Sequence, residues 1–182
     1  MPSKKHYILT AVTLGAIAAV SGGLIGVTYF FTKDQIAKNE QNKINAGIAD
    51  IFGSSATVLE EFEVKDHKYV NYCYKVTDED QSKDIALRTT GSNMYGKISL
   101  LAGFTYNVLP GGERQGEYKF VGLSLITNEQ TYASTLVENY VTPLNNDDIS
   151  LDDVSCGATY GAKLIRDMVN EATLYANEEY NG

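Results

Sequence analysis

Residues 153–161 read Asp153-Val154-Ser155-Cys156-Gly157-Ala158-Thr159-Tyr160-Gly161, and they lie directly before the strongest helical pattern of the chain. Apolar residues then recur at steps of three and four, which predicts a helix that begins near Tyr160 and buries one face. This face comprises Ile165, Met168, Val169, Ala172 and Tyr175 or Ala176. A threonine at such a helix start has two interpretations. It is a helix N-cap, or it stands where free N–H groups and the helix dipole favour an anion such as phosphate.

Composition narrows the class of protein. The chain has 182 residues, 43% of them hydrophobic, so a packed core is expected. Its formal net charge of −8 argues against nucleic-acid binding, which needs clustered Lys and Arg. Two cysteines without a C-x-x-C pattern exclude a cysteine-ligated zinc or iron–sulfur centre, and neither histidine has a partner at metal spacing. We therefore predict no metal site.

An apolar run from Tyr7 to Phe31 contains no charged residue, and a bilayer crossing needs about 20 apolar residues. Lys4 and Lys5 precede the run, so the positive-inside rule predicts a cytoplasmic N-terminus and residues from about 33 onward outside the cytoplasmic membrane. The alternative is a cleaved signal peptide, for which residues 16–18 offer an A-x-A match. Because the run continues to Phe31, we favour an uncleaved single-pass anchor. No cysteine closes the run, which excludes a lipoprotein anchor.

The chain is expected to fall into three parts: a cytoplasmic tip and transmembrane helix at 1–32, a juxtamembrane helix at 33–55, and a domain at 56–182. Residues 57–64 and 68–77 are rich in Val, Tyr and Phe, and the second segment also shows a period-two pattern, so both predict strands. The predicted strands are 57–64, 68–77, 97–108 and 120–127, with a charged connection at 78–84, a turn at 109–112 and a helix at 134–141 that Thr142-Pro143 stops. The expected fold class is α+β, an N-terminal transmembrane helix followed by an extracytoplasmic domain with a mainly antiparallel sheet packed by helices.

Residues 153–159 resemble the D-x-x-S-G-A-T signature of the FMN-binding domain found in the RnfG component of Rnf complexes and the NqrC component of the sodium-pumping NADH:quinone reductase. Residues 93–98, 100–104 and 120–126 resemble strands of the same family, so the likeness covers most of the chain. The resemblance implies that a separate flavin transferase joins FMN to Thr159 through a phosphoester. Ser155, Cys156, Gly157, Ala158 and Tyr160 would surround the attached cofactor. The transferase activates the threonine in that scheme, so no catalytic residue is expected in this chain.

The same resemblance implies an electron-transfer protein, most simply the RnfG component of an Rnf-type ion-translocating complex, which works with other membrane subunits and does not act as an enzyme alone. Three positions depart from the family: Cys156 replaces Ser, Gly161 replaces Ser or Thr, and residues 128–131 keep only the acidic residue of an E-T-P-G segment. Two alternatives therefore remain. One is a stand-alone extracytoplasmic flavoprotein for extracellular electron transfer, and the other is a flavin-free interaction domain. A disulfide between Cys73 and Cys156 is also left open.

Overall fold

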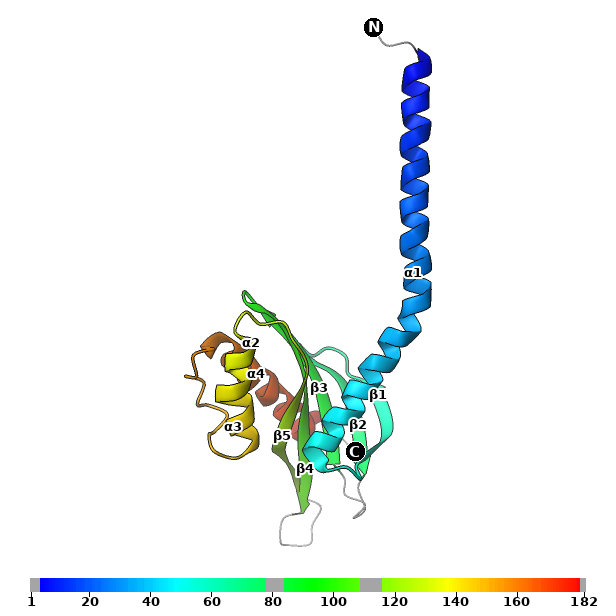
Figure 1. The fold of residues 1–182 in the computed structure, drawn as a ribbon. Helices are drawn as coiled ribbons and strands as arrows, with labels where there is room; N and C mark the ends of the chain where they lie inside the picture. Colours follow the sequence, from blue (N-terminus) through cyan, green and yellow to red (C-terminus); the bar gives the residue numbers. More distant parts are fainter. Residues whose placement is uncertain (1–3, 78–83, 109–115, 181–182) are drawn as a thin grey trace. The chain divides into compact units, whose positions relative to one another are not determined.

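A computed structural model describes residues 4–77, 84–108 and 116–180. The chain divides into two compact units, Met1–Asn42 and Lys43–Gly182, and each is considered by itself. Figure 1 shows the elements in chain order. The second unit contains a five-stranded antiparallel sheet with helices packed on it, so the predicted α+β class is confirmed.

Helix α1 runs from Lys4 to Phe52 without interruption. The sequence predicted a transmembrane helix at 1–32 and a juxtamembrane helix at 33–55, and in the structure the two predicted segments share one continuous helix. Within the first unit, the hydroxyls of Thr13, Thr28 and Thr32 donate to carbonyls four residues earlier at 2.8–2.9 Å, which satisfies them inside the helix. The segment is long and apolar enough to cross a membrane, a property that a membrane anchor and a signal sequence share.

The last turns of α1 belong to the second unit and cover one face of its sheet. Ile44 and Ile48 are 3% and 1% exposed, and they pack in one cluster with Tyr74, Val76, Ala86, Leu101 and Ile126. Small residues permit the close approach, since a Cβ on Gly103 would lie 2.4 Å from a methyl of Ile51. The C-terminal end of α1 therefore packs on the sheet of the second unit.

The sheet is a simple meander in the order β1-β2-β3-β4-β5. Its strands are β1 (Thr57–Glu63), β2 (Val70–Thr77), β3 (Asp84–Asn93), β4 (Gly96–Val108) and β5 (Gly116–Asn128). The four strands predicted from the sequence are confirmed, while β3 was not predicted, because its Thr-Thr-Gly-Ser end breaks the apolar alternation. The predicted connection at 78–84, apart from Asp84, and the predicted turn at 109–112 lie outside the described residues.

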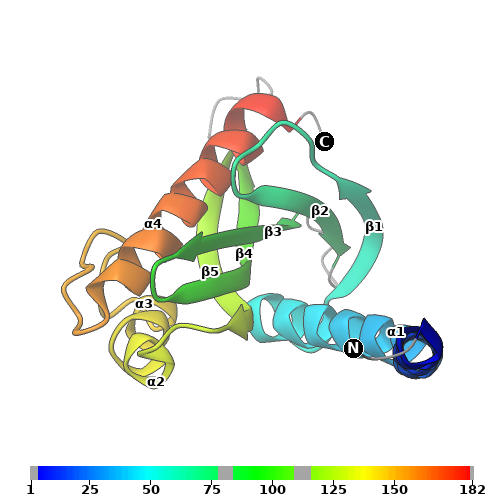
Figure 2. The ribbon, with the colours of Figure 1, turned by 90° about the horizontal axis from the view of Figure 1, so that it is seen from above.

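Helix α4 (Thr159–Leu174) covers the opposite face of the sheet (Figure 2). Its predicted apolar face is confirmed, because Ile165, Met168, Val169 and Ala172 are fully buried. They form the main core with Leu87 and other inward-facing residues of the strands. After α4 the chain makes a π-helical segment, η2 (Tyr175–Glu179). The predicted helix start near Tyr160 is also confirmed.

A further helical segment precedes α4 and consists of α2 (Ala133–Leu136), the π-helical η1 (Val137–Val141) and α3 (Thr142–Asn145). The prediction that Thr142-Pro143 stops this helix is wrong. Pro143 lies in the first turn of α3, where a helix does not need the missing N–H, so the chain continues to Asn145.

The two cysteines are both free thiols, so the disulfide considered from the sequence does not form. Cys73 faces the main core and is fully buried, and burial raises the pKa of its thiol to about 12. Cys156 is half-buried in the loop before α4.

Candidate functional site

The loop that leads into α4 is held in place from several sides. The hydroxyl of the buried Tyr140 donates to the carbonyl of Leu151 at 2.5 Å, and Asn139 Nδ2 donates to the carbonyl of Cys156 at 3.1 Å. Asp153 Oδ2 accepts from the N–H of Ser150 at 2.8 Å, and this hydrogen bond lowers the pKa of the Asp153 carboxyl. The segment before Thr159 is thus an ordered loop.

Helix α4 begins without a side-chain cap. Ala158 is the N-cap residue, and its carbonyl accepts from the N–H groups of Gly161 and Ala162 at 2.9 and 3.1 Å. The interpretation of Thr159 as an N-cap is therefore wrong, because this residue is the first of the helix. Its half-exposed side chain makes no hydrogen bond with any residue in the described part of the chain.

The backbone around Thr159 supplies free donors. Over the described ranges, the N–H groups of Gly157, Ala158, Thr159 and Tyr160 have no hydrogen-bond acceptor. Gly157 has a φ of +83°, a left-handed conformation that suits glycine. A run of unpaired N–H groups at the start of a long helix attracts anions through direct hydrogen bonds and through the helix dipole. The alternative of an anion site at this position is consistent with the observed geometry.

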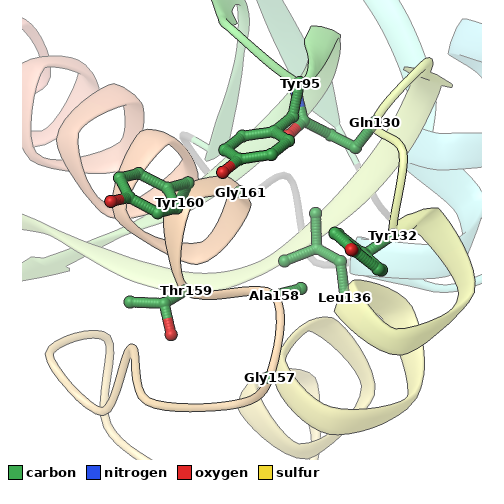
Figure 3. Close-up of a pocket in the computed structure, with 9 residues that line it drawn as sticks. All are labelled: Tyr95, Gln130, Tyr132, Leu136, Gly157, Ala158, Thr159, Tyr160 and Gly161. Carbon is green, nitrogen blue, oxygen red and sulfur yellow. The ribbon is translucent and has the colours of Figure 1, made fainter.

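A cavity of about 250 Å³ opens beside this helix start (Figure 3). Of the six residues predicted for the site, Gly157, Ala158, Thr159 and Tyr160 line it, whereas Ser155 and Cys156 do not. Ser155 is exposed and Cys156 packs partly against the main core. The other lining residues are Tyr95, Gln130, Tyr132, Leu136 and Gly161. All nine are uncharged, so a bound anion would find no ion-pair partner among them and would depend on neutral donors, the backbone N–H groups and side-chain hydroxyls.

Three tyrosines form the aromatic walls of the cavity, and only Tyr160 among them was predicted. The rings of Tyr95 and Tyr160 lie 5.2 Å apart, and those of Tyr95 and Tyr132 lie 6.4 Å apart. Tyr132 and Tyr160 are 56% and 59% exposed, so the cavity is open to solvent on that side. The tyrosines come from three separate segments, and their approach depends on the tertiary fold. Such walls suit a planar, largely apolar ring system.

Gly161 and Leu136 form the apolar floor. A Cβ on Gly161 would lie 2.8 Å from Leu136 Cδ2, closer than non-bonded carbons allow. The glycine at this position, where the resemblance leads one to expect Ser or Thr, is explained by Leu136, which fills the space that a larger side chain would take. A larger side chain at position 161 would require Leu136 to shift.

Comparison with known proteins finds a similarity to one protein family, confined to the N-terminal part of the chain. A family model described as the RnfG N-terminal region matches residues 1–51. No curated protein and no solved structure matches the chain. The chain is therefore related to RnfG by its N-terminal region. The matched residues end before the sheet, so an FMN-binding domain itself is not identified by this match.

Proposed function

We propose that this protein is a membrane-anchored flavoprotein that carries FMN covalently on Thr159. The observation that carries the proposal is the position of a free hydroxyl, four unpaired N–H groups and an aromatic-walled cavity within one short segment. A phosphate on Thr159 Oγ1 would meet N–H donors at the start of α4, and an attached ring system would find apolar and aromatic walls next to it. The residues present therefore suit the phosphate and the ring of FMN.

Attachment requires a phosphoryl-transfer step. The Thr159 Oγ1–phosphorus bond forms while the phosphoanhydride of a flavin dinucleotide breaks, the nucleoside monophosphate leaves, and the hydroxyl proton is released. No carboxylate or imidazole lines the cavity, so a separate flavin transferase would activate the hydroxyl. The half-exposed position of Thr159 beside the small Gly157 and Ala158 leaves the hydroxyl open to such an enzyme. Bound FMN would supply one- and two-electron redox chemistry.

The relation of residues 1–51 to RnfG supports a role as the corresponding component of an Rnf-type ion-translocating electron-transport complex. In this role α1 is an uncleaved membrane anchor with its N-terminus in the cytoplasm, the domain at 56–182 is extracytoplasmic and binds FMN, and other membrane subunits deliver and remove electrons. Co-purification of the tagged chain with several polytopic membrane proteins is the expected result. Isolation of the chain alone from gently solubilised membranes would instead favour a stand-alone extracytoplasmic flavoprotein.

The covalent bond is tested by co-expression of the full chain with a flavin transferase, followed by denaturing electrophoresis under ultraviolet light. A fluorescent band and an intact mass increased by one FMN phosphoester are expected. Thr159→Ala should lose both signals. Ser155→Ala is the matched control, since it removes a nearby exposed hydroxyl outside the cavity, and it should keep both. A band that persists in Thr159→Ala would overturn the proposal by showing that the flavin is attached to another residue. No band in the wild-type chain, while a known substrate is labelled, would overturn it in favour of a flavin-free interaction domain.

A further inference from the structure

The cavity contains one polar side chain whose orientation is set by its neighbours. Gln130 Nε2 lies 3.2 Å from Asn93 Oδ1 and 2.5 Å from the carbonyl oxygen of Gly96. Both neighbours are acceptors, so the nitrogen of the Gln130 amide must face them and the oxygen must face away. Figure 3 shows Gln130 beside Tyr95 on the cavity wall.

The orientation of Asn93 is determined in the same way. Its Oδ1 also accepts from the N–H of Tyr95 at 2.8 Å, and its Nδ2 donates to the carbonyl of Tyr160 at 3.0 Å. One network therefore joins the β3–β4 turn, the segment after β5 and the start of α4. Because each bond has a defined donor, neither amide can be flipped without the loss of several bonds.

This network leaves Gln130 Oε1 as an acceptor without a donor. Gln130 is 7% exposed, and its Oε1 accepts a hydrogen bond from none of the residues that the structure describes. The atom lies 3.4 Å from the place where a Cβ on Gly161, another lining residue, would stand. Although the residue as a whole is nearly buried, Oε1 is not sealed off, because Gln130 lines the cavity and this atom is accessible from it. Water can pair with it in the empty cavity, and an occupant that displaces this water keeps the hydrogen bond only if it provides an N–H or O–H group at this point.

We propose that Gln130 Oε1 accepts a hydrogen bond from the ring N3–H of the flavin and thereby sets the direction in which the ring enters the cavity. This inference rests on the proposed flavin function. Oxidised isoalloxazine carries one ring N–H, on its pyrimidine-like edge, while its dimethylbenzene edge has no donor. Gln130 therefore distinguishes the two edges: the pyrimidine-like edge enters toward the network, and the dimethylbenzene edge lies toward the exposed Tyr132 and Tyr160.

Gln130 is a positioning residue in this arrangement. Its acceptor does not react, but a ring in the reversed direction would leave Oε1 unpaired against apolar carbon. Residues 128–131 depart from the segment expected from the resemblance, and one of them, Gln130, would orient the flavin ring. The tyrosines offer the ring an aromatic surface, and Gln130 selects the direction of the ring on that surface.

The test compares two neutral flavins that lack the phosphate, lumiflavin and its N3-methyl derivative. Each is titrated into the full-length chain in detergent, produced without flavin transferase, and binding is followed by the quenching of flavin fluorescence. The second protein is Gln130→Met, which keeps the length of the side chain and removes the acceptor. Its melting temperature is measured first to confirm folding.

The wild-type chain should bind lumiflavin about tenfold more tightly than Gln130→Met does, the effect of one buried hydrogen bond. N3-methyl-lumiflavin should bind both proteins with the weaker affinity. Equal loss of both ligands in Gln130→Met would show a purely structural role, and equal affinities of the wild-type chain for the two flavins would show that water pairs with Oε1. Either result, or no saturable binding of lumiflavin, overturns the inference. The wild-type comparison needs no variant, so it decides the matter even if Gln130→Met does not fold.

These outcomes are independent of covalent attachment. A chain that is labelled at Thr159 but binds both flavins equally supports the proposed function and refutes the role of Gln130. A chain that distinguishes the two flavins but is never labelled supports the ring site and refutes the phosphoester.

Discussion

Gly96 is the residue whose substitution should damage the cavity most. It has a φ of +137°, and a Cβ built on it would lie 2.1 Å from the carbonyl oxygen of Glu129. An alanine there adds backbone strain of about 1–3 kcal/mol. The clash also pushes the β3–β4 turn away from the segment after β5. Two hydrogen bonds join these segments: Gln130 Nε2 donates to the Gly96 carbonyl, and the Thr131 N–H donates to the Tyr95 carbonyl. Loss of these two bonds adds about 2 kcal/mol, for a total of about 4 kcal/mol.

The matched control is Gly53→Ala. Gly53 has a φ of +97°, but no atom lies within 4 Å of the position of its Cβ, so the substitution adds strain without a clash. Urea and thermal unfolding of both variants, followed by circular dichroism, isolate the effect of close approach. Gly96→Ala should be less stable than Gly53→Ala by about 2 kcal/mol, which lowers Tm by roughly a further 8 °C. Equal stability of the two variants would refute the reasoning, since it would show that the turn does not press on Glu129.

Three further predictions concern single groups. Thr159→Val should change the free energy of unfolding by less than about 0.5 kcal/mol, because the hydroxyl caps no helix; a loss above about 1 kcal/mol in urea titration would show a hidden cap. Tyr140→Phe should destabilise the protein by about 1–2 kcal/mol, because the Leu151 carbonyl loses its donor, whereas Tyr132→Phe, with its exposed ring, should be neutral in the same titration. The pKa of the Cys73 thiol is raised from 9.0 to about 12 by burial, so its contribution to stability is present below about pH 9 and is lost as the pH rises toward 12. The urea midpoint should therefore fall less steeply between about pH 8 and 11 in Cys73→Ala than in the wild-type chain, and parallel curves would contradict this assignment.

Local patterns were sufficient for most secondary structure. Alternation identified β2, and the three- and four-residue steps identified α4, because burial of one face imposes these periods. The same patterns failed at β3, where the polar Thr89 and Thr90 and the small Gly91 conceal a central strand. They also failed at Pro143, because the chain enters a new helical turn at the position where the proline is tolerated.

Some residues of the candidate site were also predicted from local sequence, and others were not. The sequence singled out Thr159 and the small residues before it, since a helix start is a local feature that a short motif specifies. The resemblance drew attention to residues 93–98 and 128–131, but Tyr95, Tyr132 and Gln130 were not predicted as site residues.

The helix start beside Thr159 and the apolar N-terminal segment could therefore be predicted from the sequence alone, because each depends on residues that are neighbours in the chain. The cavity and the orientation of the Gln130 amide depend on contacts between the β3–β4 turn, the segment after β5 and the start of α4. The reason for glycine at position 161 is its contact with Leu136 of α2. Such contacts are set by sheet register and helix packing, and one-dimensional patterns do not encode which distant side chains they bring together.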